Sequence, residues 1–208
     1  VIALILFILM SIVHFGLCDW SYLGLKKYKW SVSLTHGLNI VFGIIFFHTN
    51  ETFEIFTFLS NLSFNQFQEY LYIVYICYFF LLIRYAYLAI KFTRLRWGIL
   101  EMSIILLVIF LTEPLVAFSI YFCFIHTFKH VKSILKDTSK YLSNNKFITI
   151  TTISFTILTW VGGSLAIIYL HKSFSFDESF IKTLFIGLAA LTLPHMTLVD
   201  IFYRRKFN

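Results

Sequence analysis

The sequence predicts an all-α, polytopic transmembrane helix bundle with about seven helices in 208 residues. The hydrophobic fraction is 59% and the mean hydropathy is +0.83. Only 13% of the residues are charged, against roughly 25% in a typical soluble domain. Apolar runs close to the roughly 20 residues that cross a bilayer recur along the chain, without the alternation typical of barrel strands.

The apolar runs give the expected helices in chain order. They cover residues 1–18, 31–48, 70–92, 97–112, 114–129, 147–170 and 179–203. A helix pairs its backbone N–H and C=O groups within one segment, as lipid requires. No repeat or low-complexity linker separates the runs, so we expect a single transmembrane domain, 1–208. We expect residues 49–69 to form a connecting loop.

The stretch 97–129 can form one long helix or two short ones. Pro114 stands midway, after Glu113, and Pro is well placed at the first position of a new helix. Two helices with a tight turn put every basic connection on one side of the membrane, whereas one helix would separate them. We therefore expect two helices. Each would be roughly 24–26 Å long, so a partly submerged hairpin is the alternative.

The basic residues lie in the connections between apolar runs. The clusters are Lys26, Lys27 and Lys29; Lys91, Arg94 and Arg96; Lys129, Lys132, Lys136, Lys140 and Lys146; and Arg204, Arg205 and Lys206. Despite the net charge of +7, this placement is typical of membrane topology and not of nucleic-acid binding. The positive-inside rule predicts a multi-pass protein of the cell membrane (plasma or inner membrane), with its basic loops and C-terminus in the cytoplasm.

Five of the seven histidines are expected in the inner half of the membrane, on four different helices: His14, His36, His126, His130 and His195. His48 and His171 fall on the outer side, where we expect them to face solvent. Polar groups at membrane depth are costly and usually functional. The convergence therefore favours a metal site.

His126 and His130 are four residues apart, which stacks both imidazoles on one helix face. That spacing lets one helix offer two nitrogens to a metal, although two interfacial histidines among lysines would give the same pattern. His36, in Thr35-His36-Gly37, fits a residue hydrogen-bonded to a neighbour at least as well as a ligand. Imidazole suits Zn, Cu, Fe and Ni, so ligand type alone does not select the metal.

Asp19 and Asp200 each follow a histidine by five residues, His14 and His195 respectively. Near a helix end, the simpler interpretation is a solvated carboxylate. A carboxylate can also hold the second ring nitrogen of a metal-binding histidine, although a spacing of five is imperfect for direct contact in an ideal helix. Three cysteines, Cys18, Cys77 and Cys123, show no metal-ligand spacing and are expected to be buried apolar thiols.

Four ordered segments carry a family resemblance. They read His14-Phe15-Gly16-Leu17-Cys18-Asp19-Trp20, Glu113-Pro114-Leu115-Val116-Ala117-Phe118, Tyr121-Phe122-Cys123-Phe124-Ile125-His126-Thr127-Phe128-Lys129-His130 and Leu193-Pro194-His195-Met196. Together they resemble the Brp/Blh family of bacterial and archaeal membrane β-carotene 15,15'-dioxygenases over nearly the whole chain.

The resemblance implies a non-haem Fe(2+) cofactor that activates O₂ and splits β-carotene at its central 15,15' double bond into two all-trans-retinal molecules. His14, His126 and His130 match the iron-ligand motifs. His195 matches the Pro-His motif, as a ligand or as a residue that shapes the pocket, and Asp19 is the candidate to hold a ligand from behind. The implied partners are β-carotene and O₂, the lipid bilayer and a retinal-binding rhodopsin.

The family usually carries an N-terminal Pro-His-Gly segment with a further ligand histidine, and none precedes His14 here. The sequence also opens at Val1, already inside an apolar run. Both observations lead us to expect that one or two helices of the parent protein precede this chain.

Two alternatives come from other classes of protein. A membrane di-iron desaturase or hydroxylase would need roughly eight or more histidines in H-x-x-H-H boxes, and this sequence has no adjacent histidine pair and no H-x-x-H. A transporter, or a non-catalytic accessory protein linked to rhodopsin biogenesis, would bind no iron. A transporter should also show broken helices or inverted repeats, of which Gly162-Gly163 is a faint indication.

Overall fold

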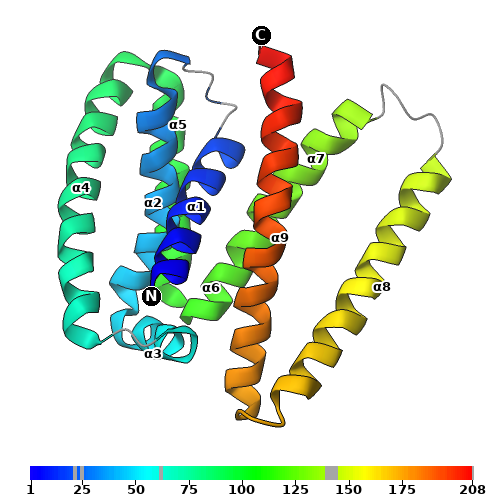
Figure 1. Ribbon diagram of the computed structural model, residues 1–208. Coiled ribbons are helices and arrows are strands. Elements are labelled where there is room, and N and C mark those ends of the chain that lie inside the picture. The colour runs from blue at the N-terminus through cyan, green and yellow to red at the C-terminus, as the bar shows by residue number, and fades with distance from the viewer. Residues whose placement is uncertain (21–22, 24–25, 61–62, 139–144, 208) are drawn as a thin grey trace. The chain divides into compact units, whose positions relative to one another are not determined.

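The computed structural model describes residues 1–208 except 21–22, 24–25, 61–62, 139–144 and 208 (Figure 1). The chain divides into unit 1, Val1–Lys136, and unit 2, Asp137–Asn208. The regular structure of the described residues is helical, and none of them forms a strand. The all-α prediction is confirmed.

Unit 1 holds most of the helices. They are α1 (Ile2–Asp19), the short η2 (Lys26–Tyr28), α2 (Lys29–Phe47), α3 (Thr49–Leu59), α4 (Phe64–Lys91), α5 (Thr93–Leu111), α6 (Pro114–Ile120), the π-helical turn η3 (Tyr121–His126) and α7 (Thr127–Thr138), which runs to the boundary with unit 2. Unit 2 consists of α8 (Asn145–Leu170) and α9 (Phe176–Phe207), which pack as an antiparallel hairpin (Figure 1).

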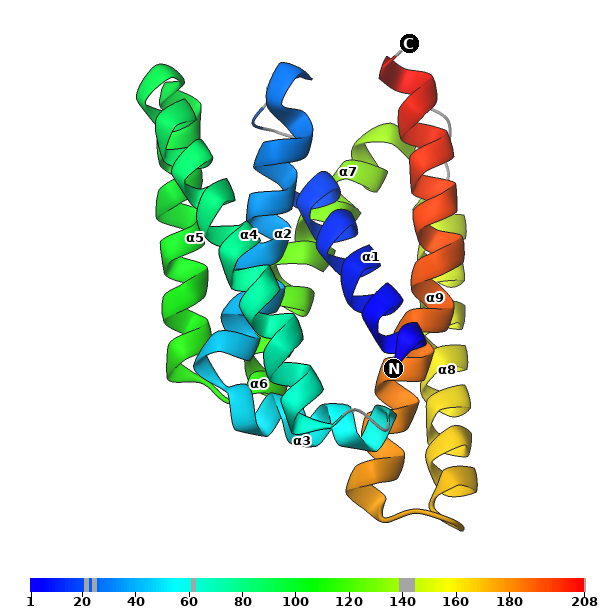
Figure 2. The ribbon, with the colours of Figure 1, turned by 60° about the vertical axis from the view of Figure 1, so that its left-hand side comes forward.

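Helix α2 is the central helix of unit 1. It packs against α1, α4 and α5 (Figure 2). In its apolar 18-residue stretch 61% of the residues are buried, the largest share of any candidate span in the described part of the chain. Glycines allow α1 and α2 to approach closely, because Gly16 faces the backbone of Ser33 and Gly37 faces the backbone of Ile12. This contact fixes the C-terminal half of α1 against α2.

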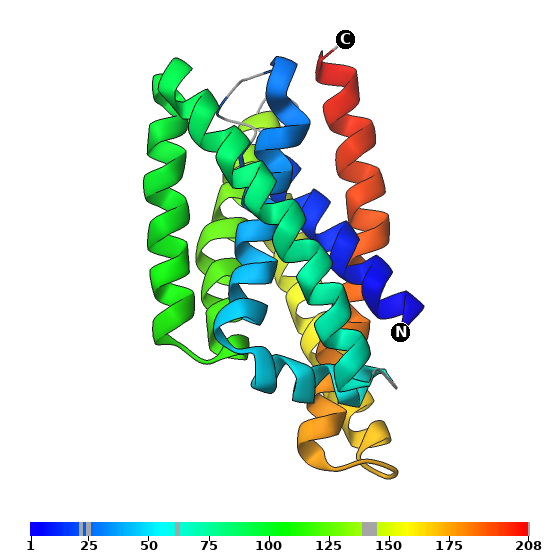
Figure 3. The same cartoon turned by 90° about the vertical axis from the view of Figure 1, so that its left-hand side faces the viewer.

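The break at Pro114 is confirmed. Helix α5 ends at Leu111, α6 begins with Pro114 at its first turn, and the two helices run antiparallel on either side of the tight turn (Figure 3). Helices α6, η3 and α7 continue each other without a gap from Pro114 to Thr138. The second segment is therefore a long helix and not half of a short hairpin.

The connection at 49–69 is not simply a loop, and this part of the prediction is wrong. Residues Thr49–Leu59 form the short helix α3, which buries Thr52 and Phe56 and packs Phe56 against Phe67 of α4. Helix α4 begins at Phe64, six residues before the predicted run, because Ser63 and Gln66 form a reciprocal capping box. The helix α3 and the early start of α4 could not be predicted from apolar composition, since this stretch is too polar to be recognised as a membrane span.

Five helical segments of the described chain are long and apolar enough to cross a membrane: Ile2–Asp19, Lys29–Phe47, Phe64–Lys91, Pro114–Lys132 and Thr149–Leu170. Helix α5 is as long as α2 but carries Arg94, Arg96 and Glu101. Several apolar helices of membrane-spanning length confirm the polytopic class.

The basic clusters of unit 1 gather at one end. Helix α1 ends, α2 begins, α4 ends, α5 begins and α7 lies at this end (Figures 2 and 3). The expected clustering of the basic connections is therefore confirmed for unit 1. The cysteines differ from expectation, because Cys77 and Cys123 are exposed on helix surfaces and only Cys18 is half-buried.

Candidate metal centre

The candidate centre lies toward the basic end of unit 1, where α1 meets η3 and α7. The residues His14 and His126 are both 5% exposed, and the centroids of their imidazole rings are 5.1 Å apart in an edge-on arrangement. The ring of His130 stacks parallel to that of His126 at 6.0 Å. The three histidines predicted as ligands are therefore neighbours, brought together from α1 and from the η3–α7 segment.

Aromatic rings enclose the two buried histidines. Phe15 packs against His126 with a centroid distance of 5.0 Å and against Tyr121 at 5.3 Å. Phe122 stacks on His126 from the preceding turn, at 5.4 Å. These rings keep water away from the imidazoles.

The carboxylate of Asp19 contacts the Nδ1 atom of His126. The Asp19 side chain is almost fully buried, and the Nδ1 atom of His126 lies 2.9 Å from its Oδ1 and 3.1 Å from its Oδ2. The Tyr121 hydroxyl donates a hydrogen bond to the same carboxylate. The sequence suggested Asp19 as a partner of His14, which precedes it by five residues. In the structure its partner is His126, because the side chains of Asp19 and His126 both point into the contact between α1 and η3.

Lys129 connects this group to the basic end. Its ammonium donates to Glu101 Oε1 of α5 at 2.5 Å and to the backbone oxygen of Asp19 at 3.3 Å. The same ammonium lies 4.5 Å from the Trp20 ring centroid, in cation–π geometry. Lys129 thus ties α7 to the end of α1 and to α5.

His36 of α2 is fully buried and stacks on Trp20 with a centroid distance of 3.6 Å. Its Nε2 lies 3.0 Å from the Tyr85 hydroxyl, which donates to the backbone oxygen of Leu95. His36 thus has the hydrogen-bonded neighbour that the sequence allowed. Within the described part of the chain, its Nδ1 has no hydrogen-bond partner.

The remaining histidines lie elsewhere. His48, at the opposite end of α2, is half-buried and bonds through Nε2 to the backbone oxygen of Ile109 at 2.8 Å, so the expectation that it faces solvent is wrong. His171 is exposed, as expected. His195 and Asp200 are in α9 of unit 2, and their side chains lie outside the described residues.

Sequence reasoning missed Tyr121, Trp20, Glu101 and Lys129 as parts of this group. The available signal was the polar residues inside apolar runs, since each needs a partner at membrane depth. Their partners are distant in sequence, with Asp19 and His126 separated by 107 positions. Spacing along one helix therefore could not reveal them.

The donor set fits a metal ion in its chemistry. The Nδ1 of His126 is hydrogen-bonded to Asp19, and the Nδ1 of His14 lies 3.6 Å from the Cys18 sulfur. A metal-ligating histidine typically has one ring nitrogen hydrogen-bonded to the protein, as His126 has through Asp19. Within the described residues, no group of three or more His, Cys, Asp or Glu side chains is close enough to bind one ion in the present positions.

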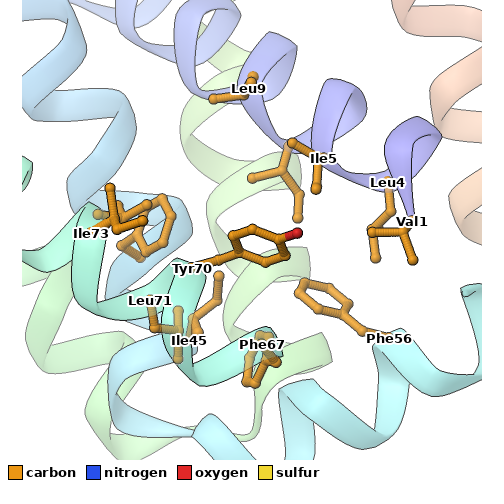
Figure 4. Close-up of a pocket in the computed structure, with 13 residues that line it drawn as sticks. Val1, Leu4, Ile5, Leu9, Ile45, Phe56, Phe67, Tyr70, Leu71 and Ile73 are labelled. Carbon is orange, nitrogen blue, oxygen red and sulfur yellow. The ribbon is translucent and has the colours of Figure 1, made fainter. Parts of the chain in front are cut away.

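An apolar cavity of about 230 Å³ lies at the other end of unit 1, between α1, α2, α3 and α4 (Figure 4). Its lining includes Leu4 and Leu9 of α1, Ile45 of α2, Phe56 of α3 and Tyr70 of α4. On α1 the lining ends at Leu9, five residues before His14, which corresponds to about 7.5 Å along a helix. None of the described side chains of the candidate centre lines the cavity. The cavity therefore does not form part of the candidate centre.

Comparison with known proteins identifies the family. A family model described as beta-carotene 15,15'-dioxygenase matches residues 1–203 of the chain. The chain belongs to the β-carotene 15,15'-dioxygenase family. A β-carotene 15,15'-dioxygenase from uncultured marine bacterium 66A03 is 29% identical over 202 residues, which cover 97% of this chain and 72% of that protein. No solved structure matches the chain.

The family resolves the choice between function classes. β-Carotene 15,15'-dioxygenases are carotenoid-cleaving enzymes, so the predicted enzyme class and the predicted resemblance are confirmed. Membership decides against a transporter or a non-catalytic accessory protein. Membership alone does not assign the metal or its ligands.

Proposed function

We propose that the chain is a membrane non-haem iron dioxygenase that cleaves β-carotene at its central 15,15' double bond with O₂. In this reaction the C15=C15' bond breaks and each carbon receives one oxygen atom, which gives two molecules of all-trans-retinal. The observation that carries the proposal is the buried pair His14 and His126, with Asp19 on the far nitrogen of His126, in a chain of this family.

His14, His126 and His130 would hold the iron, and His195 is a candidate ligand or pocket residue. Bound iron would supply the activation of O₂ that the reaction requires. Neutral imidazoles add no negative charge around the ion, and the ring contacts of Phe15 and Phe122 exclude water from the site. Asp19 keeps a proton on the Nδ1 of His126, so that its Nε2 is the nitrogen available to the metal.

The setting suits an apolar substrate. The described spans are apolar, and β-carotene dissolves only in lipid, so we propose that it enters sideways from the bilayer. We also propose that the basic end of unit 1, with the candidate centre near it, faces the cytoplasm of the cell. A retinal-binding rhodopsin would be the natural acceptor of the product.

The decisive experiment expresses the protein in cells that make β-carotene and follows β-carotene and retinal by chromatography, with and without O₂. We expect oxygen-dependent retinal as the main product from the wild type. Shorter or longer apocarotenals would overturn the cleavage position, and unchanged β-carotene beside well-folded protein would overturn the activity.

Histidine variants test the ligands in the same cells. His14→Ala and His126→Ala should abolish retinal formation and the bound iron measured in purified protein, at unchanged expression in the membrane. His48→Ala is the control, because His48 is a half-buried histidine that also has a hydrogen-bond partner in unit 1 but lies at the opposite end of α2. Retained activity in His126→Ala would remove His126 from the ligand set.

A further inference from the structure

The π-helical turn η3 separates Tyr121 from His126 by five residues, yet both side chains contact one carboxylate, that of Asp19. In a regular α-helix, with 3.6 residues per turn, residues five apart point about 140° away from each other. A π-helical turn bonds residue i to residue i+5, and here the N–H of Thr127 bonds to the oxygen of Phe122. The wider turn therefore places Tyr121 and His126 on one side of the helix.

The protonation of this group follows from its donors. Asp19 accepts from the Tyr121 hydroxyl, and its carboxylate lies within hydrogen-bond distance of the Nδ1 atom of His126. An ionised carboxylate only accepts hydrogen bonds, so in that form it pairs with the Nδ1–H tautomer of His126. The three residues are nearly inaccessible, with exposures of 2% for Asp19, 2% for Tyr121 and 5% for His126. Water therefore does not compete for these bonds, and a hydrogen bond from the Nδ1–H of His126 to the carboxylate leaves the Nε2 lone pair of His126 free of a proton.

We propose that Asp19 and Tyr121 are positioning residues, and that the π-helical turn brings them together on His126 in order to fix its tautomer and ring direction. The inference rests on the proposed function only in taking the ligand of the Nε2 atom to be iron. Tyr121 acts through Asp19, because it bonds to the carboxylate and not to the imidazole.

The first test measures iron. The variants are Asp19→Asn, which weakens the acceptor, and Tyr121→Phe, which removes one donor and keeps the ring. Removing the partner behind a metal ligand typically lowers metal affinity about 10–100-fold. We expect a loss of that size in Asp19→Asn and a smaller loss, of a few-fold, in Tyr121→Phe, measured as iron retained during titration with a chelator.

Tyr78→Phe is the matched control. Tyr78 on α4 also donates a partly buried hydrogen bond to a side chain of another helix, at Asn39 Oδ1 and 2.7 Å, but no described hydrogen bond joins it to Asp19 or His126. This variant should keep wild-type iron affinity. Equal iron loss in Tyr78→Phe and Tyr121→Phe, or wild-type affinity in Asp19→Asn, would overturn the proposal.

The second test needs no metal. In the iron-free protein with ¹⁵N-labelled histidine, the His126 signal, assigned by its loss in His126→Gln, should report the Nδ1–H tautomer. Asp19→Asn should mix the two tautomers, and Tyr121→Phe should do so less. An unchanged His126 tautomer in both variants would refute the positioning role. If the variants change the tautomer as expected but the wild-type protein binds no iron, the positioning role stands and the iron function is rejected.

Discussion

Asn39 and His36, two buried polar residues of α2, are bonded to side chains and carbonyls of other helices. Asn39 of α2 accepts from Tyr78 of α4 and donates to the backbone oxygen of Met102 on α5. His36 and Tyr85 form a second such pair, which ends at the oxygen of Leu95. In an apolar surrounding, a polar group without a partner costs several kcal/mol. These contacts therefore specify which helix faces which.

The first residue-scale prediction concerns Tyr85. Tyr85→Phe removes the partner of both His36 Nε2 and the Leu95 carbonyl, and it should lower the free energy of unfolding by about 1–3 kcal/mol. Thermal unfolding of the purified protein in detergent measures the loss. Tyr72→Phe is the control, because Tyr72 lies on the same helix and is 66% exposed. An equal shift in both variants would contradict the role of the His36–Tyr85 bond.

Helices α1 and α2 form the element pair on which the candidate centre depends. Their close approach at Gly16 and Gly37 brings the end of α1, with His14 and Asp19, into reach of η3. A Cβ atom on Gly37 would overlap the carbonyl group of Ile12. Since that carbonyl is backbone, the helices and not a flexible side chain would have to move.

The element-scale prediction follows from this overlap. Gly37→Ala should cost about 1–3 kcal/mol of stability, or more, and should also reduce retinal formation, because it displaces α1. The matched control is Gly163→Ala in α8, where no described atom lies within 4 Å of the added Cβ. There, Ala should be neutral or stabilise the helix by about 0.5–1 kcal/mol. A Gly37→Ala protein with wild-type unfolding temperature and activity would contradict the packing argument.

At the scale of the whole molecule, charge and apolar length act together. The candidate spans are long enough to cross a bilayer. The basic clusters of unit 1 lie at one end of this unit (Figure 3). Glu51 and Glu54 belong to α3, at the opposite end (Figure 3). This asymmetry is what the positive-inside rule requires of a protein with a fixed orientation.

The corresponding prediction is tested by labelling. Lys27→Cys and Lys132→Cys should react with a membrane-impermeant maleimide only after the cytoplasmic face is opened, whereas Glu51→Cys should react in intact cells. The parent, with Cys18, Cys77 and Cys123 alone, gives the background. Labelling of Lys27→Cys and Lys132→Cys from opposite sides would refute the arrangement of α1 to α7.

The class of the protein, most helix positions and the break at Pro114 could be predicted from the sequence. These depend on local composition: apolar length, a proline that cannot continue a helix, and charge in the connections. The expected topology and the family motifs also singled out His14, His126 and His130, which are neighbours in the structure. The short helix α3 escaped prediction because its stability comes from packing on α4 and not from its own hydropathy.

The partners of the histidines could be identified only in the folded structure. The partner of Asp19 is His126 and not His14, and Tyr121 joins them through a π-helical turn that no spacing in the sequence indicated. The physical reason is distance along the chain. Hydrogen bonds within a helix repeat every few residues, whereas Asp19 and His126 lie 107 residues apart and meet only because α1 packs against η3.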